Sequence, residues 1–226
     1  MKKICLRAII QEMFDVVLFD LDGTLTDPFE GITNSIIYSL DKFGIKVEDK
    51  KALTPFIGPP LYRSFTTRCG LDDSDARKAV GYYREYFSEK GIYENTVYPD
   101  AAAVLDKLKK AHKKLILATS KPEEFAVRIL KHFKLDGYFY SVAGATMDAS
   151  RSEKSDVIKY ALEACSAAER KKAVMVGDRK HDVYGAKANA IKSIGVLYGF
   201  GSREELCAAG ADFIAEKITD IPETVL

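Results

Sequence analysis

Asp20-Leu21-Asp22-Gly23-Thr24 decides the fold, because it ends the apolar run Val16-Val17-Leu18-Phe19. A short apolar run that stops at Asp and Gly is typical of a buried strand entering a tight turn. Both aspartates are then expected at the carboxyl end of a strand, the edge at which open α/β sheets bind ligands. An Asp-rich turn without chemistry would have the same composition. The stretch therefore predicts a reaction centre if other polar residues converge on it.

The rest of the chain changes character near residue 98. Amphipathic patterns predict helices over 31–43, 61–69 and 74–90, and no strand pattern occurs between residues 27 and 97. The aromatic residues of the third helix have the spacing of core packing. After Tyr98-Pro99, strands are expected to alternate with helices.

These later strands are expected at 115–118, 138–143, 173–176, 193–196 and 213–214, with helices over 100–111, from Pro122, over 154–164 and 184–190, and toward Leu226. The alternation predicts an α/β fold with a doubly wound, Rossmann-like parallel sheet. The separation of the first two strands far exceeds one crossover. We therefore expect a core domain of residues 1–26 and 98–226 and an inserted helical domain of residues 27–97.

The composition excludes several classes of protein. The 226 residues are 47% hydrophobic and 30% charged with a net charge of +1, which shows no bias toward a nucleic acid polymer or a membrane. The four cysteines are far apart, so neither a zinc site nor a disulfide framework is indicated. No apolar run reaches the roughly 18 residues of a membrane span. We expect a cytoplasmic protein, with residues 1–12 as a short extension or Met13 as the natural start.

Polar residues also follow later strands at the same predicted edge. Thr119-Ser120 ends the second strand, Gly177-Asp178 ends the fourth, and Asp182 follows four residues later. Lys154 begins the helix before the fourth strand. Each has a plain interpretation as a helix cap, a turn or a solvated cation. Their convergence on one crevice favours a functional site.

Asp-x-Asp-Gly-Thr, the strand-ending Thr-Ser, the isolated Lys and Gly-Asp-x-x-x-Asp occur in the order and spacing of the haloacid dehalogenase superfamily of phosphatases. The resemblance covers nearly the whole chain. It implies that residues 27–97 form that superfamily's helical-bundle (C1-type) cap. Phrases such as Phe56-Ile57-Gly58-Pro59-Pro60-Leu61 are similar to the phosphoglycolate phosphatase and bacterial 5'-nucleotidase-like branch. Ser120 departs from the pattern, since many members have Asn there.

The chemistry of such a site needs these residue types. Asp20 is expected to attack phosphorus and form an aspartyl phosphate. Mg2+ would offset the repulsion between this carboxylate and the phosphate, with the side chains of Asp20 and Asp178 and the backbone carbonyl of Asp22 as its ligands. Lys154, Thr119 and Ser120 are expected to bind the phosphate oxygens.

Three further residues receive roles. The Asp22 side chain is expected to protonate the leaving group and later to deprotonate water, and resemblance implies that dehalogenase members lack this acid. Asp182 should orient Lys154 or a metal-bound water. Arg63 of the cap either grips a substrate carboxylate or second phosphate, or is a surface residue.

The sequence thus predicts a Mg2+-dependent phosphomonoesterase that acts on a small phosphorylated metabolite, of the phosphoglycolate or nucleoside 5'-monophosphate class. A phosphomutase of the same superfamily, in which the phosphate passes to a sugar, is the first alternative. A non-catalytic phosphate-binding module is the second. We expect the protein to be a monomer or a homodimer.

Overall fold

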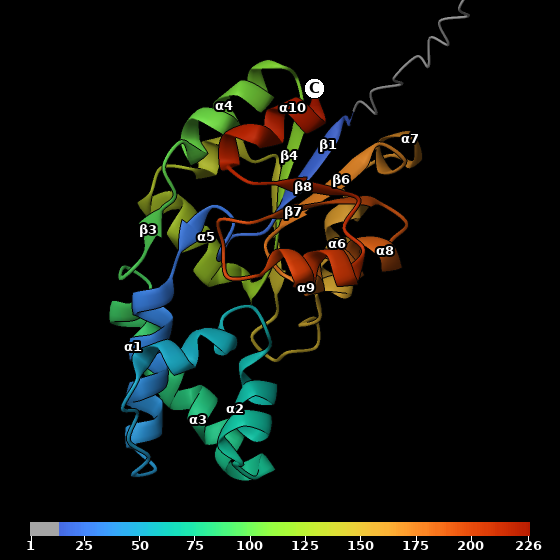
Figure 1. Ribbon diagram of the computed structural model, residues 1–226. Helices are drawn as coiled ribbons and strands as arrows, with labels where there is room; N and C mark the ends of the chain where they lie inside the picture. The colour runs from blue at the N-terminus through green and yellow to red at the C-terminus, as the bar shows by residue number, and fades with distance from the viewer. Residues whose placement is uncertain (1–13) are drawn as a thin grey trace, which may run out of the picture.

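The computed structural model describes residues 14–226, so residues 1–12 and Met13 lie outside the described part. Its core is a six-stranded sheet in the order β5-β4-β1-β6-β7-β8, and every neighbouring pair is parallel (Figure 1). The strands are β1 (Val16–Phe19), β4 (Lys114–Pro122), β5 (Ser141–Ala145), β6 (Ala173–Gly177), β7 (Lys192–Val196) and β8 (Phe213–Ala215). Successive strands add on one side of β1 and then on the other, which confirms the predicted doubly wound sheet.

Strand β1 lies inside the sheet between β4 and β6, and its four residues are fully buried. Val17 and Phe19 contribute to one apolar core, and Val16 and Leu18 to a second. This alternation follows from the two-residue period of a strand, and burial of both faces is typical of parallel sheets covered by helices. The carboxyl end of β1 therefore emerges from the centre of the protein.

Helices cover both faces of the sheet (Figure 1). Apolar residues of α4 (Ala101–Lys110), α5 (Glu123–His132) and α10 (Ile221–Val225) belong to the first core. Those of α6 (Lys154–Glu163) and Ala186 of α8 (Lys180–Ala188) belong to the second, whereas Val183 of α8 packs in a third, small cluster. The short helices α7 (Ala167–Arg170) and α9 (Arg203–Ala209) complete the core domain. Among residues 14–226, no helix combines the length and apolarity needed to cross a bilayer.

Several elements of the core differ from the sequence prediction, among them the unpredicted four-residue helix α7. Helix α8 begins at Lys180, four residues before the predicted start, because the Asp182 carboxylate accepts from the Arg179 N–H and caps the first turn. A 3-10 turn (η3, Asp136–Tyr138) occupies the predicted start of β5. Helix α9 was not predicted, since seven residues are too few for a clear helical period.

The inserted segment is helical and lies beyond one end of the sheet (Figure 1). It contains α1 (Phe29–Asp41), the 3-10 helix η1 (Lys50–Phe56), α2 (Leu61–Cys69), α3 (Asp73–Tyr86) and the π-helix η2 (Phe87–Gly91). The prediction that residues 27–97 contain no strand was wrong in one detail. Two-residue strands β2 (Thr26–Asp27) and β3 (Thr96–Val97) pair antiparallel where the segment begins and ends. This pairing supports our proposal that residues 27–97 form a cap domain.

Candidate active site

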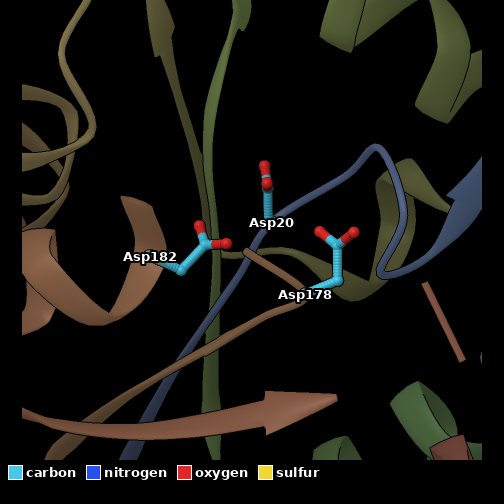
Figure 2. Close-up of side chains that lie close together, drawn as sticks. All are labelled: Asp20, Asp178 and Asp182. Carbon is cyan, nitrogen blue, oxygen red and sulfur yellow. The ribbon is translucent and has the colours of Figure 1, made fainter. Parts of the chain in front are cut away.

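Three carboxylates meet at the carboxyl ends of β1 and β6. Asp20 follows β1, Asp178 follows β6, and Asp182 lies in the first turn of α8. One oxygen of each carboxylate lies within 4.8 Å of the others, and Figure 2 shows the three side chains close together. Exposure is 6% for Asp20, 0% for Asp178 and 1% for Asp182. They lie at the carboxyl end of β1, where the chain connects to strands on opposite sides of β1. Open α/β sheets usually bind ligands in the crevice at this point.

Lys154 binds two of these carboxylates. Its Nζ lies 2.8 Å from Asp20 Oδ1 and 2.9 Å from Asp182 Oδ1, and it donates to the Ala118 carbonyl at 3.1 Å. Burial alone would lower the pKa of Lys154, but Asp182 and Asp20 outweigh it, so the ammonium form is stabilised. The structure therefore brings Lys154, Asp20 and Asp182 together in one contact network; of the two partners that the sequence left open for Asp182, Lys154 is the one it contacts.

The single positive charge of Lys154 cannot neutralise all three carboxylates of the cluster. Burial raises the pKa of Asp178 well above its usual range, and burial raises the pKa of Asp182 to about 6 although Lys154 opposes the shift. Asp178 Oδ2 accepts from the Phe200 N–H at 2.7 Å, whereas its Oδ1 is buried without a hydrogen-bond partner. Such an oxygen is costly unless a ligand or ion pairs with it.

Two glycines let the chain pack closely around Asp178. Gly23 has a φ of +81°, and a Cβ there would lie 2.2 Å from Asp178 Oδ2. A Cβ on Gly199 would lie 2.4 Å from the Asp178 Cβ and 2.2 Å from the Gly23 carbonyl oxygen. No side chain fits at either position, so backbone encloses the carboxylate.

The residues present fit a hard divalent cation. The cluster offers oxygen ligands, an excess of negative charge and a buried oxygen without a partner, all of which Mg2+ favours. The close carboxylates are Asp20, Asp178 and Asp182. The Asp22 side chain is not part of this cluster. The sequence predicted its backbone carbonyl as a metal ligand, and that stays a prediction.

Asp22 has a different partner, which the sequence interpretation missed. Its Oδ2 lies 2.8 Å from Lys121 Nζ, and its Oδ1 is buried without a hydrogen-bond partner. Burial raises the pKa of Asp22 while Lys121 opposes the shift. Lys121 lies two residues after Thr119 in β4. The register of β4 against β5 shifts between Ala118 and Pro122, and Thr119, Ser120 and Lys121 all line the cavity, so a regular strand period could not have identified the lysine.

A cavity of about 150 Å³ separates the core from the helical segment. The core contributes Asp20, Asp22, Thr119, Ser120 and Lys121 to its wall, and Thr119 is almost fully buried. The facing wall is mostly apolar and aromatic, with Ile32, Phe56, Tyr62, Val80, Tyr83 and Phe87. Tyr83 and Phe87 stack at 5.3 Å, so the aromatic stripe of the third predicted helix both packs internally and lines the cavity.

Arg63 is not among the residues that line this cavity. Its side chain is exposed on α2, where Ser64 and Phe65 are the buried positions. Arg84 of α3 lines the cavity instead, and its Nη2 donates to the Met147 carbonyl at 2.9 Å. The structure thus supports the surface alternative for Arg63 and identifies a cap arginine that the sequence interpretation had not considered.

Comparison with known proteins gives a consistent assignment. The model of the family described as haloacid dehalogenase-like hydrolase matches residues 17–196. A 5'-nucleotidase of Pseudomonas aeruginosa is 44% identical over 192 residues, which are 85% of this chain and 86% of the relative. A protein of Mycobacterium tuberculosis named tyrosine-protein kinase PtkA is 38% identical over 91% of this chain and 67% of its own length.

A solved structure agrees with the sequence relatives. The crystal structure of a predicted phosphatase from Clostridium acetobutylicum superposes with a TM-score of 0.90 and 47% identity, covering 94% of this chain and 98% of that one. The family model, the sequence relatives and the structural match each cover most of the chain. The chain belongs to the haloacid dehalogenase-like hydrolase family.

Proposed function

We propose that the protein is a Mg2+-dependent phosphomonoesterase that hydrolyses a small phosphorylated metabolite, of the phosphoglycolate or nucleoside 5'-monophosphate class, through an aspartyl phosphate on Asp20. The observation that carries the proposal is the position of Asp20. It lies at the centre of the sheet edge, paired with Lys154, within the acidic cluster and in the wall of the cavity. The family and the phosphatase relatives support the same reaction class.

Asp20 would act as the nucleophile. Its Oδ1 accepts from the Leu21 N–H and from Lys154, which fixes the carboxylate, and its second oxygen then attacks phosphorus. The bond between phosphorus and the leaving oxygen breaks as the bond to Asp20 forms. Thr119, Ser120 and Lys154 would bind the equatorial phosphoryl oxygens.

Asp22 would move the protons. Its Oδ2 is held by Lys121, so its unpartnered Oδ1 is the oxygen available to the substrate. In the first step it gives a proton to the departing oxygen, and in the second it takes one from the water that attacks the aspartyl phosphate. Inorganic phosphate leaves, and Asp20 and Asp22 return to their starting states.

Asp20, Asp178 and the Asp22 carbonyl would hold the Mg2+, with Asp182 orienting Lys154. When bound, the ion supplies positive charge against the phosphate and the surrounding carboxylates. The unpartnered Asp178 oxygen and the carboxylate excess support this assignment. We place the protein in the cytoplasm as a monomer or homodimer, with a small phosphate ester as its partner and neither a nucleic acid polymer nor a membrane.

Phosphate release tests the proposal. The protein is incubated with Mg2+ and p-nitrophenyl phosphate, phosphoglycolate, a nucleoside monophosphate or a hexose phosphate. We expect hydrolysis that EDTA abolishes, loss of turnover in Asp20→Asn with an unchanged circular dichroism spectrum, and a trapped phosphoprotein in the wild type. Near-normal hydrolysis by Asp20→Asn would overturn the proposal. Isomerisation of a hexose phosphate without phosphate release would instead favour the mutase.

A further inference from the structure

Arg84 differs from every other charged residue in the wall of the cavity. The other cation there, Lys121, is paired with Asp22 at 2.8 Å. Within residues 14–226, no carboxylate lies in ion-pair contact with Arg84, and its recorded side-chain hydrogen bond goes to a neutral carbonyl, that of Met147. A guanidinium has five N–H donors, so Arg84 can donate to a ligand while it keeps its hydrogen bond to Met147.

The surroundings of Arg84 make this imbalance significant. Tyr83 precedes it in α3, and Ile32, Val80 and Phe87 line the same wall. Apolar neighbours reduce the solvation of a cation and strengthen its attraction to an anion. Arg84 as a residue is partly buried and its guanidinium makes a solvent-exposed hydrogen bond to Met147, so the group stands where the cavity meets solvent and can bind a carboxylate or phosphate through two parallel hydrogen bonds.

We infer that Arg84 is the specificity residue of the cap and that it selects phosphate esters whose leaving group carries a second anion. This inference rests on the proposed function and deepens it. Asp20, Asp22 and Thr119 line the core side of the cavity and Arg84 the cap side, so the transferred phosphoryl group and the second anion would occupy opposite walls. Arg84 thereby takes the role that the sequence had suggested for Arg63.

Matched esters test the inference. Phosphoglycolate and 2-hydroxyethyl phosphate share a two-carbon leaving group, and only the first has a carboxylate on it. Ethane-1,2-diyl bisphosphate replaces the carboxylate with a second phosphoryl group, which distinguishes the two sources of negative charge. Values of kcat/KM are measured for all three with the Mg2+-loaded wild type, Arg84→Met, Arg84→Lys and Arg63→Met. Arg68→Met, which changes a matched exposed arginine of α2, is the control.

We expect the wild type to prefer one of the two anionic esters over 2-hydroxyethyl phosphate by about tenfold or more, the usual effect of a charged hydrogen bond. Arg84→Met should remove most of that preference, mainly through KM. Arg84→Lys should keep part of it, and Arg68→Met should keep all of it. Thermal melts of each variant check that the fold is intact.

Three results would overturn the inference. The wild type could show no preference for an anionic ester. Arg84→Met could also lower kcat/KM for all three esters equally, which is expected if Arg84 only joins the cap to the Met147 carbonyl or touches the transferred phosphoryl group. Arg63→Met could also reduce the preference as much as Arg84→Met. Failure of the proposed function looks different, because p-nitrophenyl phosphate would then not be hydrolysed by the wild type either, and both proposals would be withdrawn.

Discussion

Replacing Lys154 with methionine tests the electrostatic design of the site. Methionine fills most of the apolar volume of lysine, so Lys154→Met mainly removes one charge. That charge contacts Asp20 at 2.8 Å and Asp182 at 2.9 Å, in surroundings where the lysine side chain is only 5% exposed. Two buried carboxylates then lose their cation.

The cost can be bounded from protonation. A buried carboxylate without a partner lowers the free energy of unfolding by at most the free energy needed to protonate it. For an aspartate with an ordinary pKa near 3.9, that free energy is about 4 kcal/mol at pH 7. Asp182 already has a raised pKa of about 6, so most of this cost is present in the wild type and little is added there. We therefore expect Lys154→Met to lower the free energy of unfolding by about 3–5 kcal/mol, as for other broken buried pairs.

The sign of the pH dependence follows from the same reasoning. Carboxylates whose pKa is raised in the folded state bind more protons there than in the unfolded chain. The folded protein therefore loses stability as the pH rises above about 4. At pH 5 the protonation cost is only about 1.5 kcal/mol per carboxylate. The difference between Lys154→Met and the wild type should thus widen from pH 5 to pH 7.

Urea unfolding without divalent cations, followed by circular dichroism, measures both effects. Lys78→Met is the matched control, because Lys78 pairs with Asp75 on the surface and should contribute less than about 1 kcal/mol. A Lys154→Met protein within about 1 kcal/mol of the wild type at pH 7, or a difference that is the same at both pH values, would refute the reasoning.

Three other predictions concern the metal site and the proton carrier. Gly199→Ala should lower both Tm and activity, because its Cβ would lie 2.2 Å from the Gly23 carbonyl oxygen. Gly81→Ala in helix α3 meets nothing within 4 Å and should leave activity unchanged and Tm equal or higher, since alanine favours a helix over glycine; a loss of Tm as large as that of Gly199→Ala would contradict this. Asp22→Asn should slow the first turnover of alkyl phosphates by at least about 100-fold, because their leaving group needs a proton. The first turnover of p-nitrophenyl phosphate should slow much less, because nitrophenolate leaves without a proton. Rapid-quench measurements that show equal losses for both esters would exclude the proposed role. Mg2+ should raise Tm more at pH 7.5 than at pH 5, because the proposed ligand Asp178, whose pKa burial raises, must release its proton to bind the ion; a thermal-shift series independent of pH would count against the site.

The central part of the site could be predicted because it depends on strand ends. Asp20 and Asp178 each follow a buried apolar strand, and parallel strands bring their carboxyl ends to one edge whatever the details of packing. Only residues that directly follow a strand, or begin the next helix, can then meet at this edge of the sheet. Lys154 was predictable for a similar reason, since a helix that follows a strand in such a sheet begins near this edge.

The cap side could not be predicted in the same way. A helical period shows which residues face a core, but a residue at the border of the apolar stripe can point into a cavity or into solvent. Arg84 lies beside buried Tyr83 and reaches the cavity, whereas Arg63 lies beside buried Ser64 and is exposed. The difference depends on how α2 and α3 pack against the core, which no local pattern contains.

The pairing of β2 with β3 has a consequence for protein engineering. The chain leaves the sheet at Thr26–Asp27 and comes back at Thr96–Val97, so both crossing points are hydrogen-bonded neighbours. A graft that preserves this ribbon keeps the two junctions in register, whatever helices stand between them. Exchanging the intervening segment between relatives is thus a practical route to new selectivity on an unaltered catalytic scaffold.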